Sequence, residues 1–140
     1  SIMDKFSIFL IDNYLAFILL FFFVFALIIY ERRKGGRKID ASEATRFINK
    51  ENAIVVDLRT PAEFNGGTIA GAINLQPDTV DKENSLFKPK EEDHIILVCK
   101  LGNSSSSVGG KLIKQGFKNI NILSGGIQGW AQSGLPLVKQ

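Results

Sequence analysis

The chain has 140 residues, of which 45% are hydrophobic and 22% charged, a composition typical of one globular domain with an appendage. One cysteine and one histidine exclude an intrachain disulfide framework and an ordinary structural zinc site, so chemistry without a metal or cofactor, or simple binding, is expected. The net charge of +3 comes from residues 31–38, because residues 39–140 carry 11 basic and 11 acidic side chains. This balance argues against nucleic-acid binding.

An uncharged apolar run from Tyr14 to Tyr30 predicts one transmembrane helix of about residues 10–30 within an N-terminal segment 1–30. At about 1.5 Å per residue the run covers roughly 25 Å, and the turns before it supply the rest of a hydrocarbon core of about 30 Å. A secretory signal peptide is disfavoured because the basic residues follow the run and no small-residue cleavage site ends it. A buried core helix is disfavoured because no polar face exists. The lipid bilayer is therefore an expected partner.

Residues 31–38, with the sequence ERRKGGRK, place five Lys and Arg after the span, against one Lys before it. By the positive-inside rule this asymmetry predicts a single-pass protein with its N-terminus outside and its C-terminal domain in the cytoplasm, as at a bacterial inner membrane. We interpret the segment as a basic juxtamembrane linker in which Gly35 and Gly36 prevent a rigid continuation of the helix. Its cations can lie on anionic headgroups.

Residues 39–140 alternate short β-branched runs with helix-like stretches, which predicts an α/β domain with a central parallel sheet flanked by helices. Continuous apolar runs that end in charge or at a turn are typical of buried strands. Such runs are residues 53–58, 94–99 and 119–123.

Helix signals fall between these runs. Asp40 followed by Glu43 is similar to a capping box and predicts a helix to about Asn49. Gly109 and Gly110 lie inside another expected helix, where each costs about 1 kcal/mol relative to Ala, so close packing is expected there. Helices are also expected from residue 60, over about 105–115 and around Trp130.

Cys99 ends a buried apolar run and precedes a Gly-containing turn that opens a helix. In this arrangement backbone N–H groups from Lys100 to Ser105 can point at the sulfur, and the helix N-terminus adds partial positive charge. Such donors lower a thiol pKa and stabilise an anionic persulfide, which makes Cys99 the candidate nucleophile. Two alternatives stay open: Cys99 is a small buried apolar residue, and the run Ser104–Ser107 caps the helix.

Several segments in order resemble the single-domain rhodanese family of sulfurtransferases, over nearly all of residues 39–140. Residues 55–75, VVDLRTPAEFNGGTIAGAINL, resemble the family's Asp-x-Arg and Gly-x-Ile-x-Gly-Ala elements, and residues 98–106, VCKLGNSSS, its active-site loop. Residues 116–130 and 134–137 resemble its closing segments. The resemblance implies an α/β fold with a central parallel sheet, Cys99 as the acceptor of a sulfane sulfur, and a six-residue cradle from Cys99 to Ser104.

Two positions depart from the family pattern. Ser104 stands where the family commonly has Arg, and Thr68 where it commonly has His. Losing the Arg removes a bidentate site for a sulfonate-like donor and puts ordinary thiosulfate activity in question, but the backbone cradle is retained. Asp57 and Arg59 match the family element, and we interpret them first as structural residues near the site that tie loops together.

The leading hypothesis is a membrane-anchored, cytoplasm-facing sulfurtransferase. The Cys99 thiolate would attack a small donor such as thiosulfate or a persulfide, hold its outer sulfur as a persulfide and pass it to a thiophilic acceptor. Neither a metal nor a cofactor is expected. The backbone amides expected to bind the anionic sulfur are those of Lys100, Leu101, Gly102, Asn103, Ser104 and Ser105.

Two other hypotheses come from different classes. One is a non-catalytic, membrane-tethered binding module with an inert Cys99, suggested by the missing Arg and His. The other is a cysteine phosphatase or arsenate reductase, which is disfavoured because neither Ser104 nor Ser105 supplies the Arg that closes such a loop around an oxyanion.

Overall fold

The computed structural model describes residues 2–33, 35–81, 87, 89–100 and 103–139. The chain divides into two compact units, residues 1–33 and 34–140.

The first unit consists of helices α1 (Ile2–Asp12) and α2 (Tyr14–Arg33). The single helix predicted over residues 10–30 is therefore wrong in one respect, because the helix breaks at Asn13, where α1 and α2 are bent by 76°. The Asn13 side chain donates a hydrogen bond to the Phe9 carbonyl oxygen (2.9 Å), and such bonds compete with regular helix geometry. Within the described part of the chain no single helix passes as a membrane span, whereas the bent pair does by length and composition.

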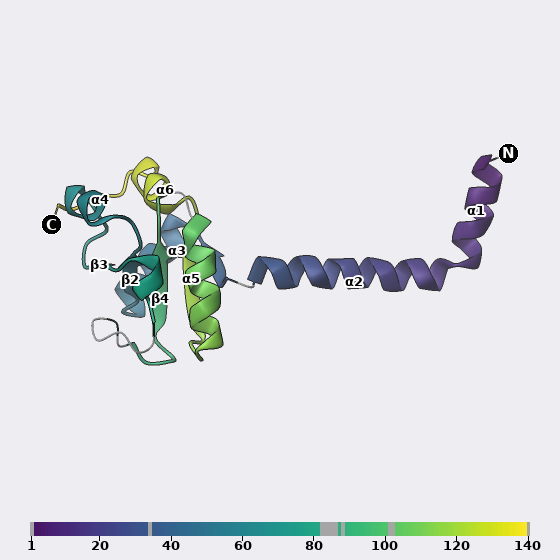
Figure 1. Cartoon of the computed structure of the whole chain (residues 1–140). Coiled ribbons are helices and arrows are strands. Elements are labelled where there is room, and N and C mark those ends of the chain that lie inside the picture. Colours follow the sequence, from purple (N-terminus) through teal and green to yellow (C-terminus); the bar gives the residue numbers. More distant parts are fainter. Residues whose placement is uncertain (1, 34, 82–86, 88, 101–102, 140) are drawn as a thin grey trace. The chain divides into compact units, whose positions relative to one another are not determined.

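The second unit is built on a parallel sheet of five strands in the order β1-β5-β4-β2-β3. Strands β2, β3 and β4 are labelled in Figure 1. A parallel sheet needs a crossover between neighbouring strands, and helices supply most of these connections. The strands are β1 (Arg37–Ile39), β2 (Ile54–Asp57), β3 (Ile73–Asn74), β4 (His94–Val98) and β5 (Asn119–Leu123). The helices are α3 (Ala41–Lys50), α4 (Pro61–Gly66), the 3-10 helix η1 (Pro77–Thr79), α5 (Asn103–Lys114) and α6 (Gly126–Gln132).

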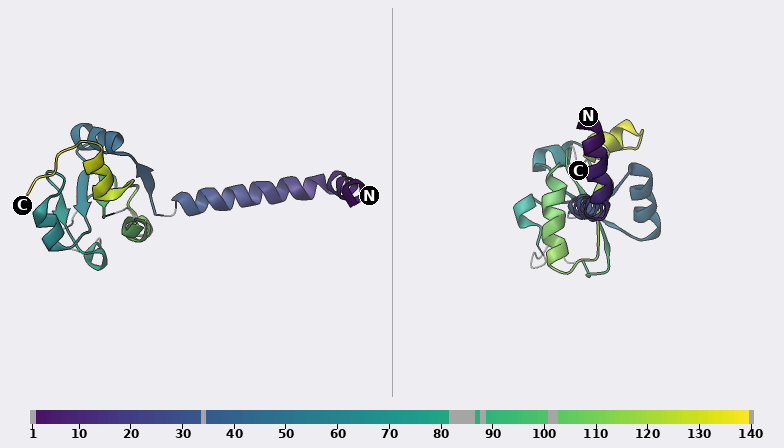
Figure 2. Two further views of the ribbon diagram at one scale, coloured as in Figure 1. Left: turned by 90° about the horizontal axis from the view of Figure 1, so that it is seen from above. Right: turned by 90° about the vertical axis from the view of Figure 1, so that its right-hand side faces the viewer.

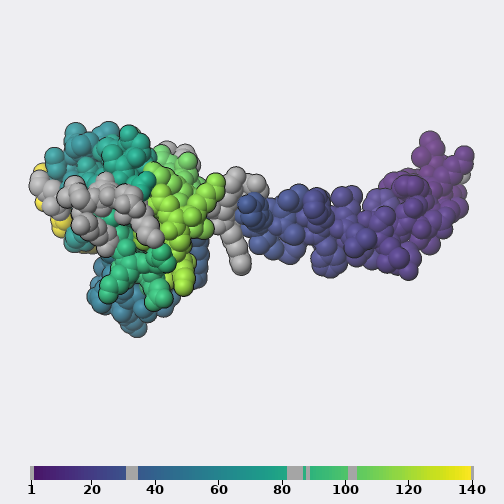
Figure 3. Space-filling view, turned by 60° about the horizontal axis from the view of Figure 1, so that its bottom comes forward, coloured from purple at the N-terminus to yellow at the C-terminus, as the bar shows by residue number. Residues whose placement is uncertain are grey.

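Helices α3 and α5 cover opposite faces of the sheet (Figure 2), and each face has its own apolar cluster. Alternate side chains of the central strand β4 enter the two clusters, as the pleat of a strand requires. Ile95 and Leu97 pack with Val108 and Leu112 of α5, whereas Ile96 and Val98 lie in the cluster that contains Phe47 of α3 and Ile127 and Trp130 of α6. The outer side of α5 remains at the surface (Figure 3, yellow-green).

The three strands and the helices predicted for this domain are confirmed, with small shifts at their ends. Asp40 caps α3 by accepting a hydrogen bond from the Glu43 backbone N–H (2.8 Å). Helix α5 begins at Asn103, two residues before the expected start, so Ser104–Ser107 lie inside the helix and do not cap it. The position before Asn103 is Gly102, which lies outside the described residues.

The expected linker differs most from the structure. Residues 37–39 form the edge strand β1, which pairs with β5, and the compact unit already begins at Lys34. Gly35 and Gly36, expected to interrupt the chain between helix and domain, are buried. They are buried because their main chain lies close to that of α5 and β5, a contact that a sequence pattern does not reveal.

Candidate functional site

The candidate site lies where strands β2 and β4 end, at one edge of the sheet. The register places Asp57 opposite Val98, and the Leu58 N–H donates to the Val98 carbonyl oxygen (2.7 Å). Asp57 ends β2 and Cys99 directly follows β4, so both are brought to the same edge. The carboxyl ends of parallel strands are the usual place for binding sites in α/β proteins.

Cys99 is buried, with 6% of its surface exposed, and belongs to the apolar cluster beneath α5. Helix α6 fixes its backbone, because the Ile127 N–H donates to the Cys99 carbonyl oxygen (2.9 Å). Gly126, at φ +58°, allows this approach: a Cβ there would overlap the same carbonyl oxygen and would lie 2.7 Å from that of Lys100. The backbone of Cys99 is therefore held by α6, and the residue before it, Val98, is held by pairing with the end of β2.

The first turn of α5 begins four residues after Cys99 and contains Asn103, Ser104 and Ser105. The first four N–H groups of an α-helix lack partners within the helix, and together they give that end a partial positive charge. Ser105 is fully buried, and its Oγ has no hydrogen-bond partner in the described structure. A buried donor of this kind is available to an anion at the end of the helix.

The other predicted members of the cradle are placed less fully. Lys100 is exposed, and its carbonyl oxygen accepts a hydrogen bond from the Gln128 N–H (3.5 Å). Leu101 and Gly102 lie outside the described residues. The convergence of the N–H groups of residues 100–105 on the sulfur therefore stays a prediction.

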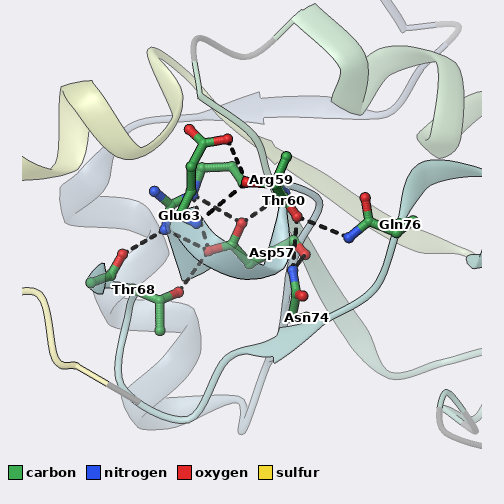
Figure 4. Close-up of polar contacts among 8 residues, drawn as sticks. Asp57, Arg59, Thr60, Glu63, Thr68, Asn74 and Gln76 are labelled. Atoms are coloured by element: carbon green, nitrogen blue, oxygen red, sulfur yellow. Dashed lines mark hydrogen bonds and ion pairs between the residues drawn. The ribbon is translucent and has the colours of Figure 1, made fainter. Parts of the chain in front are cut away.

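Asp57 is completely buried and is compensated by several donors (Figure 4). The Arg59 guanidinium binds it through Nη2 (2.9 Å to Oδ2) and Nε (3.1 Å to Oδ1). The Arg59 backbone N–H donates to Oδ1 (3.0 Å), and Arg59 also donates to the Gly67 carbonyl oxygen. The Arg59 side chain is itself only 9% exposed, so this is a buried ion pair that ties the end of β2 to the loop after α4.

Thr68 is a member of this network that sequence reasoning noted only as a departure from the family. Its Oγ1 donates to Asp57 Oδ2 (2.7 Å), and it is fully buried. Its backbone N–H and carbonyl group pair with Val138, which joins the C-terminal segment to the network. Asn74 and Gln76, also missed, donate side-chain amide hydrogens to the Arg59 carbonyl oxygen (Figure 4).

His94 lies at the opposite end of β4 from Cys99 and stacks on Phe47, with ring centroids 4.9 Å apart. It is therefore not placed to serve as a base for the cysteine. The described residues contain no group of three His, Cys, Asp or Glu side chains that could hold a metal ion.

The chain matches the model of the rhodanese-like domain over residues 40–133. A protein from Allochromatium vinosum named sulfurtransferase is 35% identical over 69% of this chain and 89% of its own length. The thiosulfate sulfurtransferase GlpE of Pseudomonas putida is 33% identical over 67% of this chain and 84% of its own. An uncharacterized protein of Escherichia coli, YibN, is 42% identical over 72% of this chain and 71% of its own length.

Solved structures agree in fold. The crystal structure of a rhodanese-related protein from Thermoplasma volcanium superposes with a TM-score of 0.64 at 29% identity, covering 74% of this chain and 99% of that one. The crystal structure of a protein from Bacillus halodurans superposes with a TM-score of 0.67 at 22% identity, covering 81% of this chain and 84% of that one. At this identity the likeness shows the fold alone.

We expect Arg59→Met to destabilise the second unit by about 3–5 kcal/mol, because it leaves the buried Asp57 carboxylate without its cation. Arg37→Met is the matched control, since the Arg37–Glu43 pair is exposed (3.3 Å, side chains 64% and 38% exposed) and should matter by about 1 kcal/mol or less. Urea unfolding of the full chain in detergent, followed by the fluorescence of the single Trp130, measures both. Equal losses in the two variants would contradict this account.

Gly126→Ala should cost more than Gly134→Ala, although both glycines have positive φ. Both variants carry the left-handed backbone cost of about 1–2 kcal/mol, but nothing lies within 4 Å of a Cβ at Gly134. The overlap with the Cys99 carbonyl oxygen should add about 1–3 kcal/mol for Gly126→Ala. The same unfolding measurement tests this difference, and an equal cost at both positions would rule the overlap out.

Proposed function

The chain belongs to the rhodanese-like domain family, and on that basis we propose that it is a sulfurtransferase that carries sulfane sulfur as a persulfide on Cys99. The observation that carries the proposal is the position of Cys99, between the carboxyl end of β4 and the N-terminal turn of α5. The relatives named sulfurtransferase and thiosulfate sulfurtransferase support the same reaction class.

The proposed transfer consists of two displacements at sulfur. The Cys99 thiolate attacks the outer sulfur of the donor, a new S–S bond forms, and the donor's remainder leaves with the electron pair of the broken bond, as sulfite does from thiosulfate. An acceptor thiolate then attacks the outer sulfur of the Cys99 persulfide, which releases the Cys99 thiolate and forms the acceptor persulfide. Electrons balance over the two steps, so no oxidant or metal is required.

The negative charge on sulfur is the quantity the site must stabilise at each stage. Because Cys99 is only 6% exposed, water contributes little, and electrostatic interactions with nearby dipoles are stronger than in solution. We assign this stabilisation to the N–H groups of Asn103, Ser104 and Ser105 at the start of α5, with those of residues 100–102 completing the cradle. The buried Ser105 hydroxyl offers one further donor.

Cys99→Ser should abolish sulfur transfer from every donor, because an alkoxide does not form a persulfide. After exposure to thiosulfate or to an organic persulfide, the wild-type chain should gain the mass of one sulfur atom on Cys99, measured by mass spectrometry of the intact chain and its peptides. Ser107→Ala, at an exposed position in α5, is the control and should behave as wild type.

Two outcomes would replace this proposal. The binding module would be favoured if Cys99 stayed unmodified after exposure to every donor and if the pH dependence of its alkylation gave the ordinary thiol pKa of about 8.5. Hydrolysis of an aryl phosphate by wild type but not by Cys99→Ser would favour a cysteine phosphatase.

We also propose that the first unit anchors the protein in a membrane, with the N-terminus outside and the second unit in the cytoplasm. In support, the large apolar side chains of α1 and α2 are exposed throughout, among them Phe21, Phe22 and Phe23 at 61–67%. The excess of cations in residues 31–38 supports the orientation.

Carbonate-washed membranes of an expressing bacterium should retain the full chain. Protease added to the outer side of spheroplasts should leave the second unit intact, whereas protease added to inverted vesicles should digest it. Replacing the five cations of residues 32–38 with Gln should produce a mixed orientation, because the charge asymmetry is lost. Recovery of the wild-type chain in the carbonate wash would refute the anchor.

A further inference from the structure

The segment that enters the second unit lies directly against the first turn of α5. A Cβ placed on Gly35 would come within 2.6 Å of the Ser106 carbonyl oxygen and 2.7 Å of its Cα. Real Cβ atoms do not approach main-chain atoms this closely, so only glycine fits without movement. The main chain at Gly35 is therefore in van der Waals contact with the main chain of α5.

One turn further along α5, a second glycine, Gly109, also contacts the main chain of Gly35. A Cβ on Gly109 would overlap the Gly35 carbonyl oxygen. Gly36 has φ +112°, and a Cβ there would lie 2.9 Å from both the carbonyl oxygen and Cγ2 of Ile120 in β5. We call Gly35, Gly36 and Gly109 the glycine seam. It joins the entry segment to α5 and to the sheet.

The seam explains a residue that is otherwise unfavourable. Gly109 lies inside α5, where it costs about 1 kcal/mol relative to Ala. The cost is offset because the absence of a side chain allows α5 and the entry segment to touch. Val108 and Leu112 hold the same helix to the sheet through the apolar cluster, so α5 is fixed from two directions.

We propose that the glycine seam is a positioning element for the sulfur site, which sets the place of the first two turns of α5 and hence of the N–H groups proposed to stabilise the Cys99 sulfur. Ser106, the residue that Gly35 touches, immediately follows Ser105 in the turn assigned to stabilise the sulfur. The inference rests on the proposed function only for its catalytic readout. The seam residues thereby support the site and are not a free tether.

Gly109→Ala in the full chain, in detergent or in membranes, tests the proposal. The added methyl should push the entry segment and α5 apart, and small misplacements of stabilising groups cost large factors in rate. We expect kcat for sulfur transfer to fall about tenfold or more with little change in KM for the donor, because the displaced N–H groups act on the charged sulfur. The pH midpoint for Cys99 alkylation by iodoacetamide should move toward the ordinary thiol value of about 8.5.

Gly66→Ala is the matched control. Gly66 lies in α4, has an ordinary φ, and has nothing within 4 Å of a Cβ, so the same chemical change should leave kcat and the alkylation midpoint at wild-type values. Gly35→Ala is the second variant, in case Gly109→Ala does not fold. It creates the overlap from the entry segment and leaves the sequence of α5 unchanged. Trp130 fluorescence reports whether each variant is folded.

The outcomes separate this proposal from the proposed function. If folded Gly109→Ala or Gly35→Ala shifts the alkylation midpoint while Gly66→Ala does not, the seam positions the site, even if no donor yields a persulfide on the wild-type chain. If the folded variants keep the wild-type alkylation midpoint and kcat and lose only stability, the seam is purely structural and the proposal is wrong.

Discussion

A buried sulfur can hold negative charge only if fixed dipoles replace the water it has lost. In the proposed mechanism the main chain supplies those dipoles, because Ser104 stands where the family commonly has an Arg guanidinium. The dipoles of a helix N-terminus act over about one turn. The place of α5 relative to β4 is thus the constraint on which the proposed chemistry depends.

The buried Asp57 carboxylate near the site must also be compensated by fixed groups of the protein, because it too has lost its water. Asp57 ends β2 and lies opposite Val98, the residue before Cys99, so an uncompensated carboxylate there would oppose the negative charge proposed for the Cys99 sulfur. Arg59 and Thr68 bind its oxygens and remove that conflict within the loop. A neutral hydroxyl at Thr68 is sufficient to complete the hydrogen bonding of the Asp57 carboxylate, because the Arg59 guanidinium already supplies the opposite charge. The departure from the family at this position therefore leaves the carboxylate satisfied.

The sequence predicted the features that arise from local patterns. The apolar runs ending at residues 58, 99 and 123 gave the three central strands, and the resemblance gave the family and the candidate nucleophile. The sequence did not predict three features: the break at Asn13, the three-residue strand β1 and the contact of Thr68 with Asp57. Each depends on one hydrogen bond or on pairing with a distant segment, for which a short polar or basic stretch carries no periodic signal. For Gly109 the sequence indicated close packing but not the partner.

The two glycines between α2 and β1 illustrate why a glycine pair cannot be interpreted without its surroundings. Glycine has the same sequence signature in a flexible linker and in a close main-chain contact, but the two uses differ in burial. A linker gains entropy by staying solvated, whereas Gly35 and Gly36 are buried against α5 and β5. Their lost backbone freedom has to be offset by packing, and Gly35 packs against α5, whose Val108 and Leu112 share an apolar cluster with Cys99. A side chain added at Gly35 would therefore overlap the main chain of α5, and this displacement of the helix would outweigh any change in the flexibility of the segment.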